Sequence, residues 1–133
     1  MANGNVVTTN GNKIMLNRAF KGSPDYLEPS LFKVGTDNTA PTIADTDLGS
    51  AVIITGGSTT KSFVVGYPII DESTLQVTFR CFLASTDANG NSLTEFGIFN
   101  NDATKLMYSR AVFTSITKTS DVEVSFVQKD QMV

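Results

Sequence analysis

Apolar and polar residues alternate along much of the chain with a period of two, which predicts β-strands. In the clearest stretch, LQVTFRCFLA, every second residue from Leu75 to Leu83 is apolar. Successive side chains of a strand point to opposite faces of a sheet, so this pattern places one set of side chains in a core. We expect Val77, Phe79, Cys81 and Leu83 to form the core face of this strand.

Short apolar runs recur elsewhere and are separated by Gly, Asn, Asp, Ser and Pro, as in proteins built of many short strands. LTEFGIFN predicts a return strand that pairs antiparallel with the first, because Asn89 and Gly90 offer a tight hairpin turn between them. KLMYSRAVFT and DVEVSFV predict two later strands, and the earlier candidates are LFKVG, AVIIT and SFVVGYP. The other expected core residues are Phe99, Phe113, Val124 and Phe126.

A helical spacing replaces this alternation near the amino terminus. Apolar residues between positions 15 and 20 recur four apart, so pairs of them stack on one face of a helix. We expect a short helix from Lys13 to Phe20, capped by Asn12 and ended by Gly22.

These patterns together predict a mainly β fold, an antiparallel β-sandwich of about seven strands with one short N-terminal helix. The 133 residues lie within the usual size of one domain, and a hydrophobic content of 41% is enough for a core. We expect a flexible N-terminal arm at residues 1–12 and a single β-sandwich domain at residues 13–133. VVTTN in this arm is a candidate to order on assembly and add a strand to a neighbouring sheet.

A carboxylate interrupts the apolar run of the predicted return strand, since Glu95 lies between Leu93 and Phe96. An unpaired buried charge costs several kcal/mol or forces neutralisation. Arg110 and Arg80 are isolated cations in the predicted neighbouring strands. We therefore expect Glu95 to be structural and to form an ion pair with Arg110 or Arg80.

The composition argues against most catalytic chemistry. The sequence contains no histidine, which removes the commonest general base, the commonest metal ligand and every Ser-His or Cys-His arrangement. Cys81 is the only cysteine, so neither an intrachain disulfide nor a thiolate cluster can form, and we interpret it as a core residue. We expect no enzymatic activity, no catalytic or metal-binding residues and no cofactor.

Two stretches resemble ligand-binding loops but have the wrong spacing. ITGGSTTKS lacks the Walker spacing between its glycines and its lysine, so we interpret it as a turn. DANGNSLTE has oxygen-bearing side chains like those of a calcium loop, but its Gly is misplaced and its Glu comes too early. We interpret the second stretch as a hairpin turn, with adventitious cation binding as the alternative.

Charge and hydropathy narrow the possible partners. The formal charge is −3 and the ten Lys and Arg residues are spread along the chain, so no basic patch for nucleic acid is visible. The amino terminus lacks the pattern of a secretory signal, and no apolar run is long enough to span a bilayer. We expect synthesis in the cytoplasm and no direct partnership with nucleic acid or membrane.

Three stretches in order resemble a known group of proteins: LFKVGTDNTAPTIADTDLGSAV, LQVTFRCFLASTDANGNSLTEFGIFNNDATKLMYSRAVF and TSITKTSDVEVSF. From about residue 14 to residue 127, the chain resembles small virion proteins of tailed bacteriophages. In layout it is similar to the amino-terminal domain of phage tail-collar fibre proteins. The corresponding positions are Val34, Gly35, Pro41, Thr46, Leu48, Glu95, Gly97, Phe99, Arg110, Ala111, Phe113 and Ile116 to Thr119.

The resemblance implies a non-enzymatic structural role in the virion of a phage, made in the cytoplasm of its bacterial host. Because the sequence has no fibre shaft after QKDQMV, we expect a tail, neck or baseplate component or a fibre-attachment adaptor. Its partners would be other virion proteins, with copies of itself forming a homo-oligomer. The alternatives are a capsid decoration protein, a carbohydrate- or host-surface-binding module and, third, a small enzyme of unfamiliar type.

Overall fold

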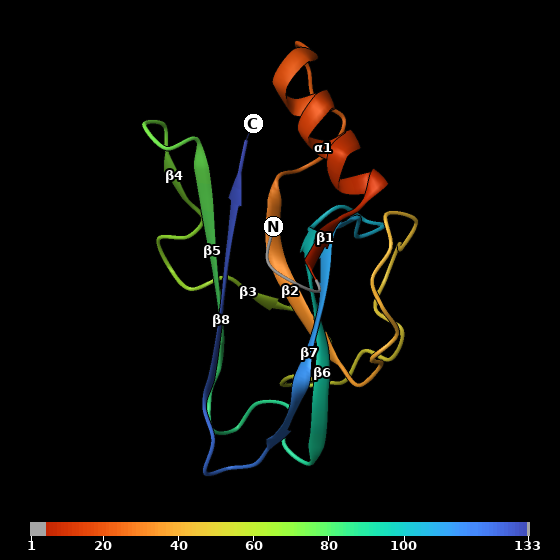
Figure 1. Ribbon diagram of the computed structural model, residues 1–133, viewed down its shortest axis with the longest axis vertical. Coiled ribbons are helices and arrows are strands. Elements are labelled where there is room, and N and C mark those ends of the chain that lie inside the picture. Colours follow the sequence, from red (N-terminus) through yellow and green to blue (C-terminus); the bar gives the residue numbers. More distant parts are fainter. Residues whose placement is uncertain (1–4, 133) are drawn as a thin grey trace.

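The computed structural model describes residues 5–132, which form eight strands and one helix (Figure 1). In chain order the elements are β1 (Asn5–Val7), α1 (Thr9–Phe20), β2 (Pro29–Gly35), β3 (Lys61–Ser62), β4 (Ile69–Asp71), β5 (Gln76–Leu83), β6 (Asn91–Asn100), β7 (Met107–Lys118) and β8 (Val124–Gln131).

Two antiparallel sheets pack face to face and enclose the main core. The larger sheet has the order β1-β7-β6-β2-β3, and the smaller has the order β4-β5-β8. The helix α1 lies at one end of this sandwich, near the carboxyl terminus of the chain (Figure 1). The predicted fold class is confirmed, with eight strands in place of about seven.

Aromatic rings from both sheets fill the space between them. Phe96 of β6 stacks on Phe126 of β8 with ring centroids 4.8 Å apart, and Phe113 of β7 lies 5.2 Å from the same ring. Five of the expected core residues are buried: Phe79, Cys81, Leu83, Phe99 and Phe126. Val77, Phe113 and Val124 are partly buried and pack against this core.

The predicted hairpin between β5 and β6 is wrong, because the two strands lie in different sheets. β5 pairs with β4 and β8, whereas β6 pairs with β2 and β7. The segment between them crosses from one sheet to the other, and its Asp87 carboxylate accepts hydrogen bonds from the Ala84 N–H and the Lys61 ammonium. The Ala88 N–H then bonds to the Ile54 carbonyl at 2.9 Å. These contacts hold the chain in a crossover, so Asn89 and Gly90 do not join paired strands.

Two further strand predictions are largely wrong. AVIIT makes only isolated bridges, from Ala51 to Gly35 and from Thr55 to Ser58. SFVVGYP contributes a single residue, Ser62, to β3. The buried side chains of Ile54 and Phe63 nevertheless belong to the core. These apolar runs reflect burial beside the sheets, where β-propensity alone does not decide the backbone conformation.

The amino-terminal segment is structured from residue 5 onward, which corrects the predicted arm. β1 pairs with β7, and α1 begins at Thr9, so residues 5–12 belong to the sandwich and the helix. Residues 1–4 of the predicted arm lie outside the described part of the chain. VVTTN, the candidate for strand addition to a neighbour, lies in β1 and at the start of α1, and both elements contact β7 of the same chain.

The helix cap is Thr8 and not Asn12. The Thr8 hydroxyl accepts a hydrogen bond from the Gly11 N–H at 3.0 Å and donates to the Met107 carbonyl of β7 at 2.7 Å. A Cβ on Gly11 would overlap the Tyr108 carbonyl, so the close approach of helix and strand requires glycine there. The helix ends at Phe20 with an extended Lys21, and Gly22 follows without acting as its cap.

The helix α1, the one helix in residues 5–132, is not long and apolar enough to cross a membrane.

Candidate functional site

The carboxylate of Glu95 is fully buried, with 0% of the residue exposed. Its Oε1 accepts hydrogen bonds from the Arg110 Nε–H and the Gly49 N–H, each at 3.0 Å. Its Oε2 accepts from the backbone N–H groups of Asp37 at 3.1 Å and Ser50 at 2.9 Å. Four donors thus compensate for the loss of water around this charge.

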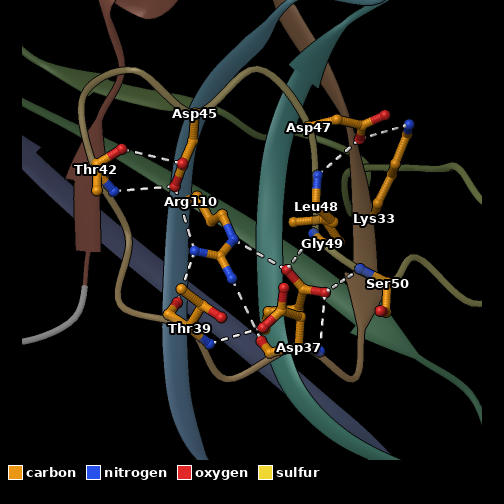
Figure 2. A network of polar contacts seen from close by, with 11 residues as sticks. Lys33, Asp37, Thr39, Thr42, Asp45, Asp47, Leu48, Gly49, Ser50 and Arg110 are labelled. Carbon is orange, nitrogen blue, oxygen red and sulfur yellow. Dashed lines mark hydrogen bonds and ion pairs between the residues drawn. The ribbon is translucent and has the colours of Figure 1, made fainter.

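Arg110 also binds the segment that follows β2, residues 36–50 (Figure 2). Its Nη1 donates to the Thr39 carbonyl at 2.9 Å and lies 3.3 Å from Oδ2 of Asp45, while its Nη2 donates to the Asp37 carbonyl at 3.4 Å. Arg110 stands opposite Gly97 on β6, so it reaches Glu95 diagonally across the strand pair.

Glu95 and Arg110 therefore clamp residues 36–50, which we call the clamped loop, onto the outer face of the larger sheet. Leu48 adds an apolar anchor by packing with Phe99 and Met107 in a second, smaller core. Lys33 of β2 binds Asp47 at 3.1 Å. The molecule thus has three layers: the smaller sheet, the larger sheet and this loop.

This third layer explains why LTEFGIFN is buried on both faces. Phe96 and Ile98 belong to the core between the sheets, whereas the intervening positions face the clamped loop. A register shift between Leu93 and Glu95 lets Leu93 join the inner core while Glu95 points to the opposite face. The carboxylate therefore interrupts an apolar run without entering the main core.

Two glycines are required by the tight contact between loop and sheet. A Cβ on Gly35 would overlap the Glu95 carboxylate and the Ser50 carbonyl. A Cβ on Gly97 would lie 2.9 Å from the Phe99 ring and 3.1 Å from Leu48. Only glycine allows this approach without a shift of the neighbouring groups.

The other candidate partner of Glu95 is elsewhere. Arg80 lies on β5 in the smaller sheet and is exposed, so the alternative pairing of Glu95 with Arg80 is wrong. The error follows from the mistaken hairpin, which would have made β5 a neighbour of β6. The ion pair in the structure joins Glu95 to Arg110.

Hydrogen bonds within the clamped loop also fix its carboxylates. The pKa of Asp37 is lowered, chiefly because the Thr39 N–H donates to it at 2.8 Å. The Asp45 carboxylate accepts from the N–H and the hydroxyl of Thr42, at 3.0 and 3.1 Å. These acidic groups hold the loop conformation, and each already has its donors.

Polar contacts that sequence reasoning missed connect the two sheets. The Tyr108 hydroxyl of β7 donates to Asp130 of β8 at 2.7 Å. Gln128 donates to the same carboxylate at 2.9 Å and to the Ser109 hydroxyl at 3.1 Å. The signal was present, because Gln128 and Asp130 continue the alternation of Val124 and Phe126 beyond the end of DVEVSFV.

A second missed cluster holds the crossover between β5 and β6. Burial opposes the charge on Asp87, but the hydrogen bonds from Lys61 and the Ala84 N–H outweigh burial and lower its pKa. The Lys118 ammonium is buried and donates to Asn89 at 2.9 Å. The DANGNS stretch is therefore part of the crossover between the sheets, and the side chains of Asp87 and Lys118 hold it in place.

The sequence also singled out Cys81 and the ITGGSTTKS stretch. Burial raises the pKa of Cys81 to about 12, so its thiol is protonated at neutral pH and is a poor nucleophile. Within residues 5–132, no group of three or more His, Cys, Asp or Glu side chains could hold a metal ion. In ITGGSTTKS, Gly56 and Gly57 have positive φ values and turn the chain.

The site as a whole has the properties of a structural clamp. Glu95 is surrounded by donors and closed to solvent, so it has no access to a substrate proton. Searches with protein-family models, curated proteins and solved structures found no match to this chain.

Proposed function

We propose that this protein is a non-enzymatic structural component of a bacteriophage particle, in the tail, neck, baseplate or fibre-attachment region. It acts through protein–protein interfaces with other virion proteins and with copies of itself. The proposal starts from the resemblance in sequence layout and is supported by the arrangement of the residues that carry it.

The clamped loop is the observation that carries the proposal. Residues far apart in the sequence, among them Gly35, Leu48, Glu95, Gly97 and Arg110, meet at this single place. Their combined effect is to fix the shape of a surface loop, on which Ile43 is exposed. A loop that is ordered before contact loses less conformational entropy on binding, which favours a role as an interface.

The copy number of the chain in purified particles tests the proposal. Quantitative mass spectrometry would measure its ratio to the major capsid protein, with a tail-tube protein as the internal control. A few copies per particle, matching one ring or a set of spikes, are expected. One copy per capsid subunit or capsomer would instead identify a decoration protein, and absence from particles would overturn the virion role.

A further inference from the structure

The outer face of α1 is an exposed apolar surface beside a positive charge. Phe20 is 83% exposed and Leu16 is 64% exposed, and the two lie four residues apart on one face. Lys13 lines the same shallow hollow as these two side chains. The helix contains Lys13 and Arg18 but no acidic residue. We call Lys13, Leu16 and Phe20 the helix face.

A groove of complementary character opens at the same end of the sandwich. It has a volume of about 390 Å³, within the range of roughly 300–1,000 Å³ typical of ligand pockets. Its floor is apolar and includes Val77 and Phe79 of β5 and Tyr108 of β7. Exposed Ile70 and Leu75 form its outer wall. We call this hollow the end groove.

Carboxylates stand at the rim of the end groove. Asp71 ends β4, Glu72 lies in the turn between β4 and β5, and Glu28 lies beside β2. Glu28 is 3.0 Å from Arg18, whereas the Asp71 carboxylate accepts hydrogen bonds from the uncharged groups of Ser73. The β4–β5 side of the rim therefore keeps a negative charge that suits an incoming lysine.

The helix face cannot fill the end groove of its own chain. Ile14 is buried against the domain on the side of α1 that lies opposite the helix face, and Met15 lines the groove. Lys13, Leu16 and Phe20 consequently point away from the sandwich. Each molecule therefore exposes both the end groove and the helix face.

We propose that the helix face of one copy docks into the end groove of a second copy. Phe20 and Leu16 enter the apolar floor as paired i and i+4 anchors, and Lys13 meets Asp71 and Glu72 at the rim. This contact would form one interface of the homo-oligomer. It rests on the proposed function only in that the virion is where the copies would assemble.

A mixed disulfide experiment tests the contact. The full chain is made as two separate variants, Phe20→Cys and Ile70→Cys, which are mixed and oxidised. The native Cys81 is buried and does not compete. The disulfide between the two variants, identified by mass, is expected to form several-fold more than random pairing would give. Random pairing, or a preference for either variant to pair with itself, would overturn the proposal.

Val65→Cys supplies the matched control, because Val65 is 97% exposed and lies outside both surfaces. Its mixture with Phe20→Cys is expected to give only the random share of mixed disulfide. An equal yield from the control and the test pair would show that exposure alone controls the reaction, and the proposal would fail.

Charge exchange gives a second readout that does not depend on cysteine chemistry. Lys13→Glu and Glu72→Lys are each expected to weaken self-association in sedimentation velocity runs at low salt, and an equimolar mixture of the two variants is expected to restore it. Mixing without recovery would overturn the contact. The copy-number measurement is independent, since particles that contain the chain but lack this contact would contradict only the docking proposal.

Discussion

Glu95 combines complete burial with full hydrogen bonding. Glutamate is almost never fully buried unless it is paired, and here its four donors come from one guanidinium and three backbone groups. Removing one partner of a buried pair leaves an uncompensated charge, which is far more costly than losing an exposed ion pair. The ion pair with Arg110 is therefore the residue-scale feature on which the clamped loop depends.

We expect Arg110→Met to lower the free energy of unfolding by about 3–5 kcal/mol, because Glu95 would remain buried without its counter-ion. Urea denaturation measures the change. Arg80→Met is the control, since this exposed arginine lies in the other sheet and its loss should change stability by less than about 0.5 kcal/mol. Similar losses for both variants would contradict the assignment.

Gly97 gives a second prediction at this scale. Alanine would bring its Cβ within 2.9 Å of Phe99 and 3.1 Å of Leu48, so Gly97→Ala should destabilise the fold by about 1–3 kcal/mol. Gly22→Ala is the matched control, because a Cβ there meets no atom within 4 Å. Thermal unfolding should separate the two variants, and equal melting temperatures would argue against the tight contact.

At the scale of elements, the start of α1 depends on a long-range contact. Thr8 caps the helix and also bonds to β7, a strand about 100 positions away in the sequence. Asn12, which local pattern favoured as the cap, is exposed inside the helix. One hydroxyl thus links the beginning of the helix to the position of the larger sheet.

Thr8→Ala should cost about 1–2 kcal/mol of unfolding free energy, because the Gly11 N–H would lose its acceptor and the Met107 carbonyl its donor. Asn12→Ala should be neutral or slightly stabilising, since alanine is the better helix former. Circular dichroism during urea unfolding compares the two variants. A larger loss for Asn12→Ala would restore the local interpretation.

Structure could be predicted from the sequence where the alternation of apolar and polar residues matches the burial of their side chains. The alternation of Phe79, Cys81 and Leu83 identified the core face of β5, and the isolated carboxylate pointed to an ion pair. Local patterns in the sequence could not reveal that the chain changes sheets after β5. The contacts of Asp87 that hold this crossover include one with a lysine 26 positions away in the sequence. The clamped loop was unpredictable for the same reason, since its partners are backbone groups that carry no sequence signature.

At the scale of the whole molecule, buried polar groups hold the layers in register. Tyr108 and Ser109 reach across to the smaller sheet, and Asp87 fixes the crossover that joins the two sheets. Such directional polar contacts restrict how one sheet can slide over the other, which a purely apolar core would not do.

The lowered pKa of Asp87 makes stability depend on pH. A carboxyl group whose pKa is lower in the folded than in the unfolded state stabilises the fold above its unfolded value and loses this contribution as pH falls through its folded value. We expect the unfolding free energy to decline below about pH 4. The decline should be shallower in Asp87→Asn, while Asp25, Asp37 and Asp71, whose pKa values are also lowered, keep part of it.

Urea unfolding at a series of pH values from neutral to about pH 3 measures this dependence. Asp121→Asn is a suitable control because Asp121 is exposed. If wild type and Asp87→Asn lost stability in parallel over the acid range, the crossover carboxylate would not be a source of the acid sensitivity.

The larger sheet holds the clamped loop mainly through the backbone of the loop, so several exposed side chains of the loop do not determine its path. Glu95 binds three backbone N–H groups, and Arg110 binds two carbonyls. Exposed positions such as Asn38, Ala40 and Ile43 take no part in these bonds. They can therefore change identity without altering the path of the chain, so the recognition properties of this surface can evolve, or be re-engineered by randomising these positions, on an unchanged scaffold.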